Sequence, residues 1–526
     1  MLRTLSTRRA ALAGIGLTLF LVSFAAANPG GAVSDEPDQY VKAVAAGHLD
    51  LIGTKVSTAE ARSMDGWVPA LNRILTGYPA FAQLARAYAI PSALDPRYLG
   101  CTFESILASC LDRARPTRSS PTEAVVSSVG SYPPYIYVPA GLVMRAASST
   151  TAALLLGRLT FALIAALLIF GSLLVALRAR PGPLTVAVIL LCVGPTSVLV
   201  MSAVNSSGPE SAAGIAWWIA LLAASEPEPP RGAWWLALAA GLVLGIARST
   251  GPVWMVLITV VVVVYRGPHV SWRALRSGGT MAIATLVVCV VAGVATLSWQ
   301  VATEPAFQSS LAPTLSSASP SMIGEIFSRA IATFGWGEAS PVSVLAQVWG
   351  LLVASVVALG VGAALTRRAW RELAAFVAIC AAVVAVMAAF LAFGSHAGVI
   401  QGRWFLAPLA GIPIVSGWMA GAPHAGVGGV RSGRLVSGIV VIGTAACLAT
   451  YWWLNEYRYA VNGGSPFFLG HALWQPPLGW TPWLACAVVG LLSLLFAGLS
   501  GGRGTVGSNR ANASLVMPPD PISFAR

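Results

Sequence analysis

The apolar stretch Ala11–Ala27, ALAGIGLTLFLVSFAAA, is followed by a polar segment that opens with Ser34-Asp35-Glu36-Pro37-Asp38. The apolar run is long enough to cross a membrane as a helix. Six of the seven aspartates of the chain lie between this run and the next apolar run. The segment after the first span is therefore where acid–base or metal chemistry is expected.

The composition extends this view to the whole chain. Of its 526 residues, 56% are hydrophobic and only 10% are charged, whereas soluble domains are about a quarter charged. The sequence therefore predicts an all-α integral membrane protein. The net charge of +13 comes almost entirely from arginine, since Lys42 and Lys55 are the only lysines. The arginines are spread over short connections rather than gathered in one patch, which argues against a nucleic-acid partner. A P-loop, an H-E-x-x-H motif and a C-x-x-C motif are all absent from the sequence.

Apolar run lengths predict about twelve transmembrane helices. The arginines recur in every second connection, which places the N- and C-termini in the cytoplasm and residues 28–131 outside. After the first helix the predicted spans are 152–177, 182–203, 211–225, 232–248, 252–265, 280–301, 341–365, 373–394, 404–420, 435–454 and 480–499.

The polar segment after the first span predicts an extracytoplasmic loop subdomain that is mixed but mostly helical. Helix-like spacing of apolar residues runs through Pro69–Ala89. After Pro133-Pro134, the run Ile136–Ala147 is too short to cross and predicts an interfacial helix. The first helix has a basic start and ends in alanines, so a cleaved signal peptide is the alternative to a retained helix. The predicted divisions are 1–27 (cytoplasmic N-terminus and first helix), 28–151 (loop subdomain), 152–499 (multi-pass domain) and 500–526 (disordered cytoplasmic tail).

Two cysteines stand close together in the loop subdomain. Cys101 and Cys110 are nine positions apart, whereas the other five are scattered singly through the spans. An oxidising compartment favours a disulfide between them. The alternative is a pair of unbonded small apolar side chains.

Asp35 and Glu36 are the candidate catalytic residues. Because they are adjacent, their side chains point in different directions, so one can face a site while the other is held by a partner. A carboxylate at the membrane boundary can act as a general base or bind a divalent cation. Asp35 is the candidate ligand for such a cation. The alternative is a cap, since Ser34 and Asp35 before Pro37 are typical of a helix N-terminus.

Polar residues at the outer ends of other spans are candidates for substrate binding. Arg248 and Arg403 lie where the distribution of positive charge disfavours arginine, and an arginine fork can hold a phosphate. Pairing with a lipid headgroup or with an internal acid is the alternative, with Glu210 and Glu338 as candidate partners. The candidate substrate-binding residues are Tyr132, Arg158, Arg248, Arg403 and Trp404.

Several motifs together resemble the bacterial multi-pass membrane family called domain of unknown function 2142. The resemblance covers roughly residues 10–420, and its Asp-Glu-Pro and Gln-Gly-Arg-aromatic motifs are the most specific. The family has a His two residues after Asp-Glu-Pro, where this chain has Gln39. The matching pieces are Asp35-Glu36-Pro37, Cys101 and Cys110, Tyr132-Pro133-Pro134-Tyr135-x-Tyr137, Gly157-Arg158-Leu159, Asn205 to Glu210, Arg248 to Trp254, Phe334-Gly335-Trp336 and Gln401-Gly402-Arg403-Trp404-Phe405-x-x-Pro408.

The layout of this family is similar to that of the C-type superfamily of membrane glycosyltransferases. That similarity implies an enzyme of the bacterial plasma membrane that moves a sugar from a polyprenyl-phosphate carrier to an envelope acceptor. It implies a base or metal role for Asp35 and phosphate-facing roles for the outer arginines. The alternative is a non-catalytic transporter or assembly partner for envelope polysaccharide.

Overall fold

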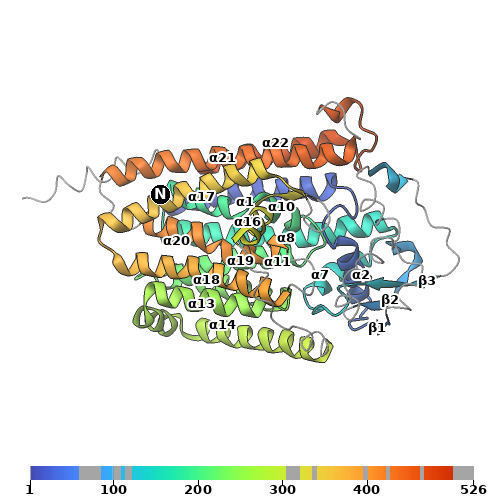
Figure 1. Ribbon diagram of the computed structural model, residues 1–526, viewed down its shortest axis with the longest axis horizontal. Coiled ribbons are helices and arrows are strands. Elements are labelled where there is room, and N and C mark those ends of the chain that lie inside the picture. Colours follow the sequence, from blue (N-terminus) through green and yellow to red (C-terminus); the bar gives the residue numbers. More distant parts are fainter. Residues whose placement is uncertain are drawn as a thin grey trace, which may run out of the picture.

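The computed structural model describes residues 2–57, 85–96, 99, 108–112, 121–303, 320–334, 340–394, 401–421, 427–461 and 467–500. Long helices run side by side along the longest axis, and a small subdomain covers one end of them (Figure 1). The bundle comprises α1 (Leu2–Ala27), α8 (Thr150–Ala179), α9 (Pro183–Cys192), α10 (Pro195–Met201), α11 (Ser207–Ala224), α12 (Ala233–Ala247), α13 (Gly251–Arg266), α14 (Pro268–Thr303), α16 (Pro320–Ile331), α17 (Ser343–Thr366), α18 (Trp370–Gly394), α19 (Leu406–Leu409), α20 (Gly411–Ala420), α21 (Val427–Ala460) and α22 (Trp480–Leu499).

Many of these helices are suited to a membrane, where every backbone N–H and C=O must be satisfied within the protein. Among the described residues, seven helices are long and apolar enough to cross one. The count becomes eight if α9 and α10, which are bent by 67° relative to each other, form one broken span. The helices α12 and α13 are apolar but shorter. The chain is thus a multi-pass membrane protein, and the figure of about twelve spans stays a prediction.

The first helix is built into the bundle, packed against α8 and α22. A Cβ added to Gly16 would lie 2.8 Å from the carbonyl oxygen of Gly490, so glycine allows α1 and α22 to approach closely. Near the start of α1, Nε of Arg9 donates to the carbonyl oxygen of Ala497 at 3.2 Å. The first turns of α1 and the last turns of α22 therefore lie at the same end of the bundle.

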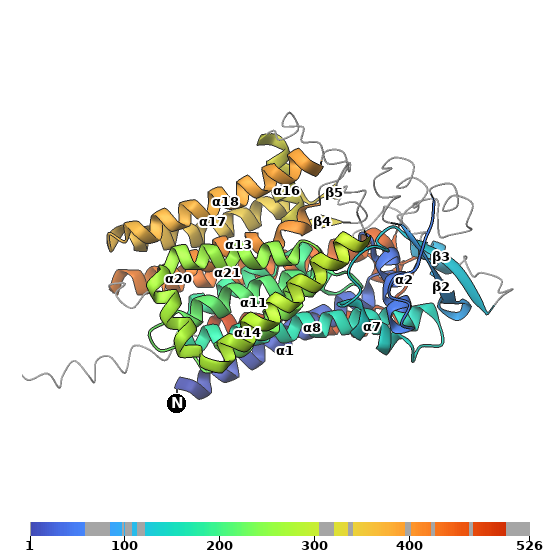
Figure 2. The ribbon, with the colours of Figure 1, turned by 90° about the horizontal axis from the view of Figure 1, so that it is seen from below.

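The connections that carry arginines meet at this same end, opposite the small subdomain (Figures 1 and 2). Glu226, between α11 and α12, pairs with Arg180 after α8 and with Arg266 at the end of α13, each at 2.9 Å. Arg367, after α17, donates to the carbonyl oxygen of Met419 in α20 at 2.9 Å. The prediction that these connections share one side of the membrane agrees with this arrangement. Which side faces the cytoplasm stays a prediction.

The small subdomain contains more β-structure than we predict from the sequence. It consists of α2 (Glu36–Gly47), α7 (Tyr137–Met144) and an antiparallel sheet of order β1-β2-β3, with β1 at Thr54–Lys55, β2 at Arg86–Pro91 and β3 at Thr122–Ser127. The helical prediction is wrong for Arg86–Ala89, because these residues pair with β3 from Arg86↔Ser127 to Ala89↔Ala124. A short helix, α7, is present where the interfacial helix is predicted, and its place at the membrane interface stays a prediction.

Helices α2 and α7 touch through glycine. A Cβ on Gly47 would lie 2.2 Å from the carbonyl oxygen of Gly141, and one on Gly141 would lie 2.1 Å from that of Ala43. This contact fixes α2, and with it the acidic motif at its start, against α7 and the outer end of α8. Three predictions fall outside the described residues or side chains: the Cys101–Cys110 disulfide, the role of Glu338 and the disordered tail.

Candidate functional site

Asp35 immediately precedes α2 but does not cap it. Its backbone is left-handed, at φ 58° and ψ 8°, and its side chain makes no capping hydrogen bond. Few residues other than glycine adopt this conformation, although aspartate and asparagine tolerate it best. The carboxylate of the neighbouring Glu36 does not cap the helix here either: it accepts a hydrogen bond at 3.2 Å from the backbone N–H of Gly31, which lies before α2. The capping interpretation of Asp35 is wrong, and its side chain is available for another role.

The partner of Asp35 is Arg403. Nη2 of Arg403 donates to Oδ2 of Asp35 in a short ion pair. The Arg403 side chain is only 3% exposed, whereas that of Asp35 is 21% exposed. A buried arginine thus holds a carboxylate that still reaches the surface of the protein.

The Gln-Gly-Arg-Trp motif that carries Arg403 is held in place by its glycine. It forms the 3₁₀ turn η7 (Gly402–Phe405), which leads into α19. A Cβ on Gly402 would lie 2.2 Å from the backbone nitrogen of Ala330 in α16, so a larger residue cannot pack there. The close packing of η7 on α16 therefore fixes the position of the Arg403 backbone, from which the guanidinium reaches Asp35.

Arg248, at the end of α12, forms a cluster with Asp35, Arg403 and Trp404. Its guanidinium carbon lies 5.6 Å from the ring centre of Tyr132 and 5.4 Å from that of Trp404. Its Nη1 donates to the hydroxyl of Ser207 at 2.8 Å and lies 3.7 Å from a carboxylate oxygen of Glu210. The prediction that Glu210 is a partner of an outer arginine is confirmed. Cation–π contacts of this kind orient a guanidinium without using its donors.

Several polar atoms next to this cluster have no hydrogen-bond partner among the described residues. They are Oε1 of Gln401, Nε1 of Trp404 and Oγ of Ser206, all shielded from solvent. Buried polar groups are nearly always satisfied by protein, water or a ligand. Two of the three belong to the motif that carries Arg403, which is consistent with a bound polar molecule beside it.

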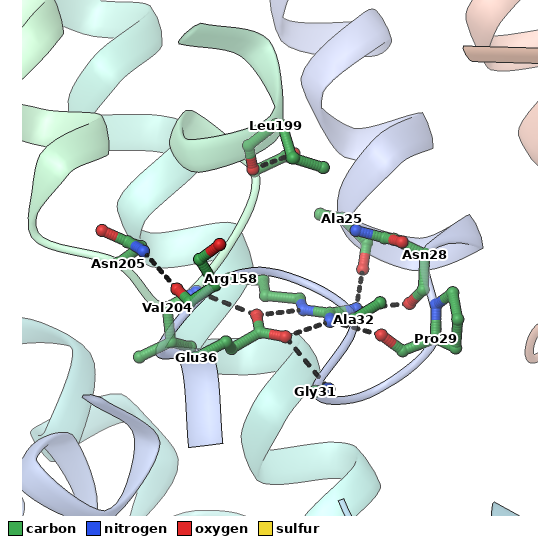
Figure 3. Close-up of polar contacts among 12 residues, drawn as sticks. Ala25, Asn28, Pro29, Gly31, Ala32, Glu36, Arg158, Leu199, Val204 and Asn205 are labelled. Carbon is green, nitrogen blue, oxygen red and sulfur yellow. Dashed lines mark hydrogen bonds and ion pairs between the residues drawn. The ribbon is translucent and has the colours of Figure 1, made fainter. Parts of the chain in front are cut away.

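Glu36 and Arg158 form a separate, fully enclosed pair (Figure 3). Nε and Nη2 of Arg158 donate to the two carboxylate oxygens of Glu36 at 2.7 and 2.5 Å. The other donors reach the carbonyl oxygens of Ala25, Asn28 and Pro29 at 2.5 to 3.0 Å. All five N–H groups of a guanidinium are therefore used. Arg158 joins the end of α1 to α2, and a phosphate could bind it only by displacing protein partners.

The Glu36 carboxylate also accepts hydrogen bonds from the protein backbone. Its Oε1 accepts from the backbone N–H of Val204 at 3.1 Å, which ties α2 to the connection between α10 and α11. The amide of Asn205 in the same connection donates to the carbonyl oxygen of Ser34 at 2.9 Å. These bonds hold the segment on both sides of Asp35, so Glu36 has a positioning role in this geometry.

Gln39, two residues after the Asp-Glu-Pro motif, bridges three elements. Its Oε1 accepts from the hydroxyl of Tyr137 at 2.8 Å and from the backbone N–H of Ser206 at 2.7 Å. An amide oxygen therefore connects α2 with α7 and with the start of α11. An amide oxygen has two lone pairs, so Gln39 can accept both hydrogen bonds while staying uncharged.

Two ionisable residues of α2 were not singled out in the sequence. Asp38 is fully buried, and burial raises its pKa to about 8, although the backbone N–H of Ser128 opposes this at 2.6 Å. Lys42 is also buried, and loss of hydration lowers its pKa to about 7. Its ammonium donates to the hydroxyl of Tyr88 and to the carbonyl oxygens of Leu51 and Gly130, at 2.6 to 2.8 Å. The signal that could have pointed to Lys42 is its rarity, since the chain has only one other lysine.

A metal ion finds few ligands in the part of the chain that the structure describes. Those residues contain no group of three or more His, Cys, Asp or Glu side chains placed to hold an ion. The Asp35 carboxylate is paired with Arg403, which competes with a cation for it. The cluster is therefore better suited to an anion than to a divalent cation.

A cavity of about 680 Å³ lies beside Arg158, between the end of α1 and the start of α8. Its wall combines apolar side chains such as Leu154 with polar ones such as Asp95 and Thr150, and Trp474 closes it from the connection before α22. Arg158 is the predicted site residue that lines this space. The cavity lies where the ends of α1 and α8 meet the small subdomain.

The sequence was compared with known protein families. Residues 17–412 match the family described as "Predicted membrane protein (DUF2142)". The match covers more than half of the chain and includes both the acidic motif and the Gln-Gly-Arg-Trp motif. No curated protein matches the sequence. The chain therefore belongs to the DUF2142 family of predicted membrane proteins.

Proposed function

We propose that this protein is a glycosyltransferase that moves a sugar from a polyprenyl-phosphate carrier to an acceptor of the cell envelope. The reaction takes place at the outer face of the bacterial plasma membrane, at the end of the bundle that carries the small subdomain. The observation that carries the proposal is the Asp35–Arg403 pair, in which a partly exposed carboxylate is backed by a buried arginine.

Asp35 is the general base in this proposal. The acceptor hydroxyl transfers its proton to a carboxylate oxygen of Asp35 while its oxygen bonds to the anomeric carbon of the sugar. The bond between that carbon and the phosphate oxygen breaks, and the electron pair leaves with the polyprenyl phosphate. A base must lie within hydrogen-bond reach of the proton it takes. The exposed fraction of Asp35 gives an acceptor access to it.

The arginines stabilise the departing phosphate. Arg403 and Arg248 come from separate connections and both lie beside the acidic motif, so their charges reinforce each other where the negative charge develops. Each guanidinium can hold two phosphate oxygens at once. Tyr132 and Trp404 flank Arg248 and orient its planar group. This arrangement supplies the positive charge without a divalent cation.

Glu36 and Arg158 act as positioning residues in this proposal. Their saturated bonds hold the start of α2 against the end of α1, and Asp35 is the residue directly before Glu36. The cavity beside Arg158 suits part of the lipid-linked substrate, because its lining combines apolar side chains with polar ones.

The direct test uses the purified full-length protein in proteoliposomes with polyprenyl-phosphate-linked monosaccharides. We expect acceptor-dependent release of polyprenyl phosphate from one of these donors, and loss of release in Asp35→Asn. The non-catalytic alternative, an assembly partner or transporter for envelope polysaccharide, predicts that the wild-type protein and Asp35→Asn release equally little. That result, with a folded protein and a full panel of donors, would contradict the enzyme proposal.

A further inference from the structure

A second cavity, of about 570 Å³, lies at the opposite end of the bundle from the outer site. Four separate parts of the chain enclose it: the connections after α8, after α11 and after α17, and the end of α13 with the start of α14. Arginines and glutamates line it together with Tyr265, which is buried. The charged residues of the lining are Arg180, Glu226, Arg266, Arg273, Arg371 and Glu372.

The carboxylates of this cavity are already engaged. Oε1 of Glu226 accepts hydrogen bonds from Arg180 and Arg266, each at 2.9 Å, and from Nε1 of Trp418 at 2.8 Å. Glu372 pairs with Arg367 at 3.1 Å. Each glutamate of the lining therefore has an arginine partner, and neither is left to neutralise the remaining two arginines.

The positive charge left over comes from Arg273 and Arg371. Neither has an ion pair or hydrogen bond within the described part of the chain, and both are exposed. The guanidinium of Arg371 lies directly against Gly267, because a Cβ at that glycine would come within 1.9 Å of its Nη2. Gly267 has φ 91°, so a glycine there both makes the turn after α13 and leaves room for the guanidinium.

One further donor lies at this cavity. Nε of Arg180 is shielded from solvent and has no partner among the described residues, although both terminal nitrogens of the same guanidinium are bonded. A buried N–H of this kind is normally satisfied. The cavity thus combines an unsatisfied donor with two uncompensated charges, a pattern that fits an anion.

The start of α14 indicates that a membrane surface lies next to the cavity. The helix changes direction at Gly279, at φ 53° and ψ −133°, so residues 268–278 form a separate arm at the end of the bundle (Figure 2). On this arm Trp272 is 55% exposed, and the guanidinium of Arg276 lies 4.9 Å from its ring centre. Exposed tryptophan combined with arginine is typical of a helix in the headgroup region.

We propose that this cavity binds the phosphate group of an anionic membrane lipid. Arg273 and Arg371 hold the phosphate oxygens, and the acyl chains lie beside the arm that carries Trp272. Basic pockets between membrane helices on the side rich in arginine are suited to such headgroups. A bound lipid joins four connections, so it stabilises this end of the bundle independently of the outer site.

The test is a thermal-unfolding titration of the full-length protein in detergent with phosphatidylglycerol, phosphatidylcholine or inorganic phosphate. We expect phosphatidylglycerol, but not phosphatidylcholine, to raise the midpoint of unfolding. The double variant Arg273→Gln/Arg371→Gln should weaken the apparent affinity for phosphatidylglycerol roughly 30-fold. Both arginines are exposed, so these substitutions leave the fold intact.

The matched control is Arg178→Gln/Arg231→Gln, which removes the same charge from exposed positions at the same end of the bundle but outside the lining. It should shift the affinity less than threefold. A response to inorganic phosphate that the first double variant removes also supports the site and assigns recognition to the phosphate alone. Equal effects of phosphatidylglycerol and phosphatidylcholine, or equal losses in the two double variants, would overturn the proposal.

Discussion

The carboxylate of Asp35 forms an ion pair with the guanidinium of Arg403, which lies 368 positions further along the chain. The pair joins the residue before α2 to the turn before α19, so the first outer segment and the Gln-Gly-Arg-Trp motif share one place. Arg403 is enclosed, whereas Asp35 remains partly exposed. This asymmetry is the basis of the enzyme proposal, in which the acid takes a proton and the arginine holds both the acid and a phosphate.

Arg403→Lys should lower kcat about tenfold or more, because lysine keeps the charge but loses the planar fork that binds two oxygens. The protein should still insert and unfold near the wild-type temperature. The control is Arg145→Lys, an exposed arginine after α7 in the outer subdomain. Transfer rates of the two variants in proteoliposomes check this, and equal rates for Arg403→Lys and Arg145→Lys would contradict it.

Glu36→Gln should destabilise the protein by about 3–5 kcal/mol, since it leaves the enclosed Arg158 without its charged partner. Its side chain and that of Arg158 are 0% and 3% exposed. Glu325→Gln is the control, because Glu325 is 52% exposed and its pair with Arg329 lies on one helix face. That change should alter stability by less than about 1 kcal/mol. Thermal unfolding in detergent measures both, and comparable shifts would show that the Glu36–Arg158 pair is not structural.

Stability should depend on pH through Asp38 and Lys42 of the outer subdomain. The raised pKa of Asp38, about 8, means that the folded state binds its proton more tightly than the unfolded state does. Stability therefore falls as pH rises from about 4 to 8, by at most about 1.4 kcal/mol per pH unit. The lowered pKa of Lys42, about 7, has the opposite sign, so this lysine makes stability rise with pH from about 7 to 10.5 and offsets the decline due to Asp38 between pH 7 and 8.

Asp38→Asn separates the two effects, because it removes the acid while an amide oxygen can still accept from the N–H of Ser128. We expect the variant to lose the decline between pH 5 and 7.5 and to keep the rise above pH 8. Unfolding midpoints across this range measure the result. A decline of unchanged slope in Asp38→Asn would show that another group titrates.

The orientation of the bundle is tested by cysteine labelling from outside the cell. Thr54 on β1 and Ser500 after α22 are exposed, and they lie at opposite ends of the structure. In a background without native cysteines, Thr54→Cys should react with a membrane-impermeant reagent in intact cells, whereas Ser500→Cys should react only after lysis. The reverse pattern would place the candidate site in the cytoplasm and remove the basis of an outer-face reaction.

Much of the helical part of the fold follows from apolar run lengths, because a lipid environment leaves few alternatives to a helix. The spacing of arginines also predicts correctly that their connections share one end. The strands β2 and β3 were harder to predict, since they are short and Arg86 pairs with Ser127, far along the chain. Their pairing depends on the packing of α2 beneath them, which local spacing does not encode.

The site shows the same division. Asp35, Arg248 and Arg403 stand out in the sequence because charged residues are rare at the outer ends of spans. Which charged residues pair with each other depends on the three-dimensional packing. Arg158, for example, pairs with Glu36, which is 122 positions away in the sequence. The left-handed backbone of Asp35 was also beyond prediction, because Ser34-Asp35 before Pro37 is equally typical of an ordinary helix start.

The central claim is that the Asp35 carboxylate takes the acceptor's proton, and Asp35→Asn tests it most directly. Asparagine tolerates the left-handed backbone and can still accept from Arg403. Asp35 is 21% exposed, so its pair with Arg403 should contribute less to stability than the enclosed Glu36–Arg158 pair, and the unfolding temperature of Asp35→Asn separates loss of the base from loss of the fold. In cells that depend on this protein, Asp35→Asn should insert normally and fail to restore function. Asp50→Asn, a change of the same kind at the acid that accepts from the N–H of Gly53, should restore it. Full function in Asp35→Asn would contradict the account.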